Sequence, residues 1–378
     1  NMKSEKSTLP KDMVARIVMS NDQYINPEYL LANFTLYKEH LIQPVHELLM
    51  KMSMVERDER WTVNVNRMQD DYSFYFKIRQ IEVQNNEDDV NSYLRLLCWM
   101  LTASHPQLRY HVTRLVYGWL LKYTRLCNNL IDAFYKCNDP YVLRGIYSSV
   151  YGVLLVKRDK DLIHQISKLI FEKLYNQHFY VPSEIEVRTW TLKILEFNHL
   201  YNPEDGYWEI ASPPYPRMDN LLLVPDGEDV YKKDYFGSEG GALKLHRSLF
   251  EWDFNRYIIG TNTNNASKTY FRDGVGVSLS SITEAVAYRI KHEYKYSKKL
   301  SEYDDTVTWD TRSSRVNERI GKKYQWIALG EVKAYLCDVC QIKKDWWGNK
   351  PPVEIPYPWY DREKTLFPSV SNIALLRL

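Results

Sequence analysis

Pro140-Tyr-Val-Leu-Arg144 opens a long apolar run, and Pro106-Gln-Leu-Arg109 opens a similar run earlier in the chain. Each run contains a Tyr-Gly pair, Tyr151-Gly152 and Tyr117-Gly118, followed after one residue by Leu-Leu. The two opening prolines lie 34 residues apart, and so do the two Tyr-Gly pairs. A fixed offset of this size is typical of helical-hairpin repeats.

A third, looser copy opens at Pro182-Ser-Glu-Ile-Glu-Val-Arg188, 42 residues after the second. Start signals for helices accompany these copies. Asn138 or Asp139 is expected to cap the helix that begins at the next proline, where the missing N–H costs nothing. Ser183 and Glu186 have the spacing of a capping box. The signals predict that each copy begins with a helix.

Second helices are expected between these opening helices, over Tyr123–Lys136 and Asp161–Asn176, because their apolar residues recur every three or four positions. Pro27–Met52 and Glu87–Leu101 are expected to extend the same array. One hairpin cannot bury its apolar face alone, so neighbouring copies must stack. The sequence therefore predicts a mainly α fold, with a TPR- or HEAT-like α-solenoid over residues 1–200.

The character of the sequence changes after Tyr201, where two groups of proline and glycine residues break the helical pattern. We expect residues 201–378 to form a smaller α or α+β domain packed on the solenoid. The predicted elements are a short strand at Leu221–Val224, a helix end or a strand at Trp252–Ile259, helices at Ser281–Tyr294 and Ser314–Tyr335, and an extended segment at Trp346–Pro368.

An arginine follows each opening proline, and the three are Arg109, Arg144 and Arg188. We expect these structural arginines to tie one repeat to the next by charge-assisted hydrogen bonds.

The composition excludes several classes of protein. Lys and Arg number 50 against 48 Asp and Glu, so no global charge points to nucleic acid or to a membrane surface. The five cysteines make no disulfide framework and fit a cytoplasmic setting, and no apolar run is long enough to span a bilayer. The 30 tyrosines and 11 tryptophans suit either helix-packing seams or interface anchors.

Motifs that carry chemistry are incomplete. Cys337-Asp-Val-Cys340 lacks a second pair of ligands for zinc, and Gly237-Ser-Glu-Gly-Gly241 lacks the Lys-Ser/Thr of a phosphate-binding loop. Gly274-Val-Gly276 lacks the third glycine of a dinucleotide-binding turn. We therefore expect no catalytic, cofactor-binding or metal-binding residues. A hydrolase whose site is assembled between the two halves stays open as an alternative.

A basic tract with interleaved tyrosines runs over Lys291–Lys299, with Lys322-Lys323 downstream. Such a tract holds single-stranded nucleic acid or forms the solvated flank of a helix, and we expect the second. Candidate contacts to a protein partner are large aromatic residues in polar or breaker-rich sequence, namely Tyr294, Tyr296, Trp346 and Trp347.

Five segments resemble the C-terminal region of the bacterial antiviral STAND ATPases, the Avs family, in the family's order. These segments are Glu56-Arg-Asp-Glu-Arg-Trp61, Leu97-Cys-Trp-Met-Leu-Thr102, Asn138-Asp-Pro-Tyr-Val-Leu-Arg144, Asp253-Phe-Asn-Arg-Tyr-Ile-Ile-Gly260 and Glu318-Arg-Ile-Gly-Lys-Lys-Tyr-Gln-Trp-Ile-Ala328.

The resemblance implies a sensor. In that family the helical-repeat region grips a phage protein, the large terminase subunit or the portal, and an upstream ATPase then oligomerises and activates an effector. This chain has neither Walker element. The resemblance thus implies a target-binding module whose ATPase and effector modules belong to other parts of a longer chain.

Overall fold

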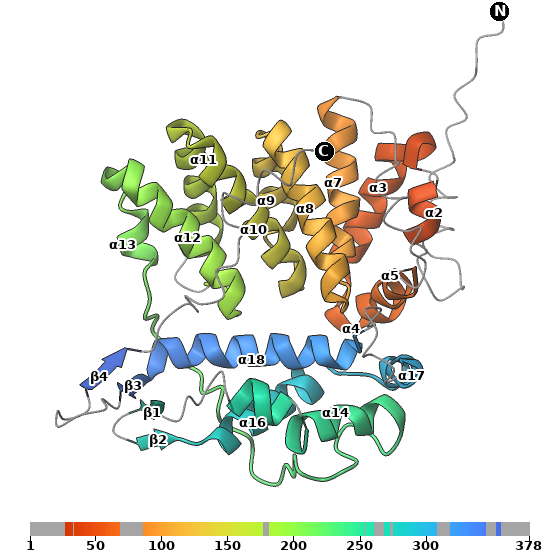
Figure 1. Cartoon of the computed structure of the whole chain (residues 1–378), viewed down its shortest axis with the longest axis vertical. Coiled ribbons are helices and arrows are strands. Elements are labelled where there is room, and N and C mark those ends of the chain that lie inside the picture. Colours follow the sequence, from red (N-terminus) through yellow and green to blue (C-terminus); the bar gives the residue numbers. More distant parts are fainter. Residues whose placement is uncertain are drawn as a thin grey trace, which may run out of the picture.

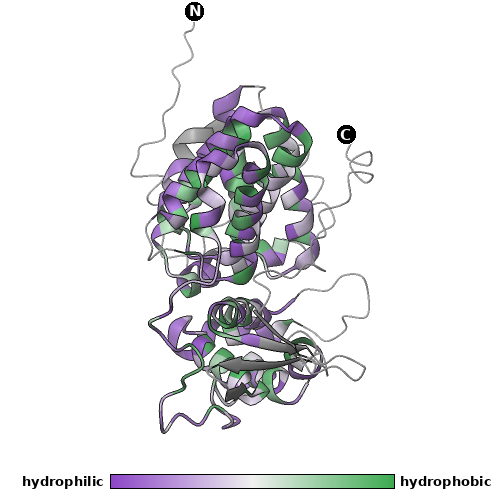
Figure 2. Ribbon diagram, turned by 90° about the vertical axis from the view of Figure 1, so that its left-hand side faces the viewer, coloured by the Kyte–Doolittle hydropathy of each residue, from purple (hydrophilic) through white to green (hydrophobic). Residues whose placement is uncertain are grey.

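The computed structural model describes residues 27–32, 34–68, 86–176, 181–252, 254–260, 268–272, 275–307, 318–344 and 353–356. The described chain is mainly α-helical, which confirms the predicted fold class. Its helices form two lobes, one above the other in Figures 1 and 2. We call them the repeat lobe and the C-terminal lobe.

The repeat lobe is a row of antiparallel helices standing side by side (Figure 1). The predicted pairs are present, with bounds close to those expected. The row consists of α2 (Pro27–Ala32), α3 (Phe34–Lys51), α7 (Glu87–Met100), α8 (Pro106–Lys122), α9 (Leu126–Phe134), α10 (Pro140–Lys157), α11 (Lys160–Ile170) with the π-helical turn η2 (Phe171–Tyr175), α12 (Ile185–Tyr201), the short turn η3 (Pro203–Asp205) and α13 (Tyr207–Ala211).

The helix starts follow from local hydrogen bonds. Asn138 and Asp139 were the two candidate caps of α10. Asp139 is the cap, and its carboxylate accepts a hydrogen bond from the backbone N–H of Tyr141. The capping box expected at Ser183 is wrong. Glu184 caps α12 instead, because its carboxylate accepts from the N–H groups of Glu186 and Val187.

One continuous apolar core runs through the repeat lobe from α2 to α13. Its largest fully buried side chains include Trp61, Trp99 and Phe134. Trp61 belongs to the short segment that follows α3, made of α4 (Met54–Arg57), the π-helical turn η1 (Asp58–Thr62) and α5 (Val63–Met68). This core extends through Ala211, so the chain enters the C-terminal lobe only after α13.

The C-terminal lobe contains helices and a small antiparallel sheet in the order β2-β1-β3-β4. The sheet makes this lobe α+β. Its elements are α14 (Gly240–Phe250), η4 (Phe254–Ile259), β1 (Lys268–Arg272), β2 (Val275–Val277), α16 (Leu279–Tyr288), η5 (Arg289–Glu293), α17 (Lys298–Thr306), α18 (Ile320–Val339), β3 (Gln341–Lys344) and β4 (Val353–Pro356).

Helix α18 runs across the lower ends of the repeat helices, between the two lobes (Figure 1). Most of its residues are buried, including Tyr324, Ile327 and Tyr335. The second apolar core is built around this helix and also takes in Tyr141 of α10 and Met54 of α4. The two lobes therefore share buried side chains at their junction.

Several predicted elements differ in the structure. Leu221–Val224 is a turn and not a strand, within the irregular segment that joins α13 to α14. The undecided segment Trp252–Ile259 ends in the π-helical η4, and Gly240 starts α14. Helix α18 begins at Ile320 and continues beyond Tyr335, and residues 314–317 of the expected helix lie outside the described residues. Of the expected extended segment after Trp346, only β4 lies within the described residues.

Candidate recognition site

A fully buried cluster of charges joins the two lobes. The ammonium of Lys323 on α18 lies 2.8 Å from a carboxylate oxygen of Asp58 and 2.7 Å from one of Asp139. The guanidinium of Arg57 lies 3.6 Å from Asp139. All four side chains have zero exposure, and their two positive and two negative charges balance. We call this group the ionic cluster.

The ionic cluster is held by further hydrogen bonds. Thr62 donates to Asp58 at 2.5 Å, and Arg57 donates to the side chain of Asn138 at 2.6 Å. Burial raises the pKa of Asp58 although the Lys323 ammonium opposes it. Burial also opposes ionisation of Asp139, but Lys323 and Arg57 lower its pKa. A buried ionic group of this kind fixes geometry, because removing one member leaves an uncompensated charge.

The five segments that carry the sequence resemblance meet at this junction. Two of them supply Asp58 and Asp139, and a third supplies Lys323. The indole of Trp61 donates to the carbonyl of Trp99 at 2.7 Å, which adds the fourth segment. The ring of Phe254, in the fifth, packs edge-on against Trp326 with centroids 5.4 Å apart.

The three repeat arginines do not share one role. Arg144 ties its repeat to the next by donating to Glu184 at 3.0 and 2.7 Å, as expected. Arg188 reaches α18 instead, because it donates to both carboxylate oxygens of Asp338 at 2.9 and 3.2 Å. Arg109 donates to Ala103 within its own repeat. The guanidinium carbon of Arg109 also lies 4.2 Å from the ring centroid of Tyr141, which belongs to the next repeat.

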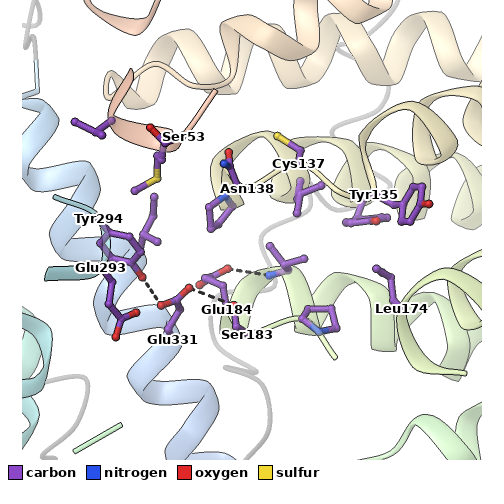
Figure 3. Close-up of a pocket in the computed structure, with 18 of the residues that line it drawn as sticks. Ser53, Tyr135, Cys137, Asn138, Leu174, Ser183, Glu184, Glu293, Tyr294 and Glu331 are labelled. Atoms are coloured by element: carbon purple, nitrogen blue, oxygen red, sulfur yellow. Dashed lines mark hydrogen bonds between the residues drawn. The ribbon is translucent and has the colours of Figure 1, made fainter. Parts of the chain in front are cut away.

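A cavity of about 510 Å³ lies between the lobes, with one wall from the repeat helices and one from α18 and the loop after η5 (Figure 3). We call it the inter-lobe cavity. Its lining combines apolar side chains with three carboxylates. The lining includes Leu143, Tyr147, Glu184, Val187, Glu293, Tyr294, Lys295, Ile327 and Glu331.

Most polar groups of the inter-lobe cavity are already engaged. Glu331 accepts hydrogen bonds from Arg289, from Tyr294 and from Ser183, the last at 3.2 Å. Glu184 is bound to Arg144 and caps α12. These carboxylates are therefore occupied as acceptors.

The cavity also lacks an activated nucleophile among the described residues. Burial raises the pKa of the Cys137 thiol to about 11, so it stays protonated at neutral pH. The Ser53 hydroxyl donates to the carboxylate of Glu56 at 2.7 Å. This hydrogen bond belongs to the capping box of α4.

A second, more open hollow of about 600 Å³ lies on the other side of the α10 start, and we call it the repeat groove. Tyr141 and Arg144 line the groove, whereas Pro140 and Leu143 line the inter-lobe cavity. The groove crosses the starts of α8, α10 and α12 and reaches α18 and η4. Its aromatic and cationic lining consists of Arg109, Tyr141, Arg144, Trp190, Tyr257, Lys322 and Trp326.

Of the four aromatic residues predicted to contact a partner, Tyr294 and Tyr296 lie within the described residues. Tyr294 lines the inter-lobe cavity, half-buried, with its hydroxyl bound to Glu331. Tyr296 is buried in the second core and donates to Asp304 at 2.8 Å, so its expected place at a partner surface is wrong. Trp346 and Trp347 lie outside the described residues. The sequence did not predict the aromatic residues of the repeat groove, because only the fold brings their four segments together.

Three of the four lysines in the tract Lys291–Lys299 lie near acidic side chains. Lys299 lies 3.6 Å from Glu59, and Lys298 lies 3.9 Å from Glu302. Lys291 is 4.0 Å from Glu228. The rings of both interleaved tyrosines also pack edge-on against Tyr324, with centroids 5.9 Å apart in each pair.

Features of other site classes are lacking in the described part of the chain. No group of three or more His, Cys, Asp or Glu side chains there is arranged to hold a metal ion. Cys337 and Cys340 are buried. No described helix combines the length and apolar character that a membrane span requires.

Comparison with protein-family models, with curated proteins and with solved structures finds no match.

Proposed function

We propose that the chain is the target-recognition module of an antiviral STAND sensor, acts in the bacterial cytoplasm and binds a phage protein. Candidate targets are the large terminase subunit and the portal. The ATPase and effector functions of such a sensor would reside in modules other than this one. This module itself would bind and not catalyse.

The repeat groove is the observation that carries the proposal. Trp, Tyr and Arg are the residues in which binding energy concentrates at protein interfaces. The groove gathers Trp190, Tyr257 and Trp326 around Arg109, and Tyr257 is 64% exposed. These residues come from α8, α12, η4 and α18. The relative position of repeat helices and α18 therefore sets the shape that a target must match.

The charges that line the repeat groove favour an acidic side chain on the target. Arg144 is paired with Glu184, and Lys322 is paired with Glu318 at 3.0 Å. Arg109 has no carboxylate partner among the described residues. An acidic side chain of the target would complete this site, in line with the charge complementarity of protein interfaces.

Capture from a lysate of phage-infected cells tests the proposal. The tagged chain is expected to retain the large terminase subunit or the portal, and Arg109→Ala is expected to weaken retention. Tyr231→Ala serves as a control, because Tyr231 is 51% exposed and lies away from the repeat groove. Recovery of nucleic acid that washes off with salt, without either viral protein, would refute the proposal.

A further inference from the structure

Two carboxylates lie at one end of the inter-lobe cavity. Glu293 and Glu331 share a single guanidinium, that of Arg289, which lies 2.9 Å from Glu293 and also contacts Glu331. The third carboxylate, Glu184, has its own partner in Arg144. Glu293 therefore has no ion-pair partner to itself. In agreement, burial and the neighbouring Glu331 raise the pKa of Glu293 even though Arg289 lowers it.

A second, independent feature of the cavity is an unsatisfied hydroxyl. Tyr147 lines the cavity and is 1% exposed. Its hydroxyl has no hydrogen-bond partner among the described residues. Because buried polar groups in native proteins are almost always paired, such a hydroxyl indicates a missing partner.

The rest of the lining is apolar. Leu143 and Val187 come from the repeat helices, and Ile327 comes from α18. The volume of about 510 Å³ falls within the range of small-molecule sites, roughly 300–1,000 Å³. The cavity therefore offers an apolar chamber with a carboxylate end and a few fixed polar groups.

We propose that the inter-lobe cavity binds a small organic cation, an amidinium or guanidinium group carried on an apolar or aromatic body. Glu293 would receive the cation as a charge-assisted hydrogen-bond acceptor. The apolar side chains would cover the body, and the Tyr147 hydroxyl would accept a hydrogen bond from the ligand. The site is distinct from the repeat groove and does not depend on the proposed function.

Lys295 provides a second test of the proposed cation site, with an effect opposite to that of Glu293. This residue lines the same cavity, is exposed, and has no ion-pair partner among the described residues. It adopts a positive φ of 55°, which is uncommon for a residue with a side chain and clusters at functional sites. Its ammonium would repel a cationic ligand. Removing Lys295 is therefore expected to strengthen binding, whereas neutralising Glu293 is expected to weaken it.

Titration calorimetry with benzamidine and its neutral analogue benzamide tests the proposal on the full chain. Benzamidine is expected to bind at least about tenfold more tightly than benzamide, since only the amidinium makes a charge-assisted contact. Glu293→Gln is expected to reduce benzamidine affinity about tenfold and to leave benzamide affinity unchanged. Lys295→Met is expected to raise benzamidine affinity.

Glu302→Gln is the matched control, because Glu302 is an exposed carboxylate on α17 outside the cavity. It is expected to bind benzamidine as the unaltered chain does. Thermal unfolding of each variant shows whether it is folded. Equal affinity for the two compounds, no binding of benzamidine up to its solubility limit, or full affinity in folded Glu293→Gln would each overturn the proposal.

Discussion

Arg144 and Glu184 form a two-point ion pair, with guanidinium nitrogens 3.0 and 2.7 Å from the two carboxylate oxygens. The pair joins α10 to the start of α12 and separates two hollows. Arg144 lines the repeat groove, and Glu184 lines the inter-lobe cavity. The same carboxylate caps α12. The ion pair therefore fixes the spacing of two repeats. It also forms part of the wall between the repeat groove and the inter-lobe cavity.

This pair is expected to contribute measurably to stability. A double-mutant cycle with Arg144→Met and Glu184→Gln should give a coupling free energy of about 1.5–3 kcal/mol, because both groups are largely buried and doubly bonded. The exposed pair of Lys173 and Asp132 should give only about 0–1 kcal/mol. Urea unfolding measures both cycles. Equal coupling in the two pairs would show that burial adds nothing here.

The ionic cluster is expected to be the most sensitive point of the junction. Lys323→Met leaves two buried carboxylates with only Arg57 to compensate them, so the free energy of unfolding should fall by about 3–5 kcal/mol. Lys298→Met changes a lysine that is 91% exposed and should stay within about 0.5 kcal/mol of the unaltered chain. A similar, small effect of both substitutions would contradict the structural role of the cluster.

Gly330 on α18 is expected to be required by the close approach of α12. A methyl group at this position would overlap the carboxylate of Glu184, which its cap and ion pair hold in place. Gly330→Ala should therefore destabilise the protein by about 1–3 kcal/mol, in spite of the better helix propensity of alanine. Gly118→Ala is the matched control, because no atom lies within 4 Å of the added carbon. That control should stabilise α8 by about 0.5–1 kcal/mol.

His46 gives the repeat lobe a defined response to acid. Burial, with Arg95 adding to it, lowers the pKa of His46 from 6.5 to about 4, and its ring accepts a hydrogen bond from Trp99. The folded pKa is below the unfolded value, so this stabilisation is complete above pH 6.5 and is lost as the pH falls towards 4. The loss should approach about 3 kcal/mol.

Urea unfolding over that pH range tests this point. In His46→Phe, whose ring can pack against Trp99 and Phe134 as His46 does, this part of the pH dependence should disappear. An unchanged slope in the variant would assign the acid sensitivity to other groups.

Sequence predicted the repeat helices well because their signals are local. Pro140 with Asp139 before it defines the start of α10, and the spacing of apolar residues defines the helix that follows. The cap of α12 was misassigned to Ser183 because two adjacent residues, Ser183 and Glu184, are both able to cap. Only the ion pair with Arg144 orients the glutamate.

The candidate sites were less predictable because they depend on contacts far apart in sequence. Lys323 meets Asp58 across 265 positions, and nothing local marks either residue as buried. Tyr296 was expected at the surface because it lies in polar sequence, yet it packs in the second core. The sheet was missed for the same reason, since β1 pairs with β3 from the far side of α18.

Whether the repeat groove binds a viral protein is tested by measuring the binding of purified terminase or portal to groove variants of the chain. Tyr257→Ala removes an exposed ring and should leave the fold intact. If the claim holds, the purified viral protein binds the unaltered chain and the Tyr231→Ala control equally, and binds Tyr257→Ala at least about tenfold more weakly. Equal binding by all three proteins, or no binding by the unaltered chain, would contradict it.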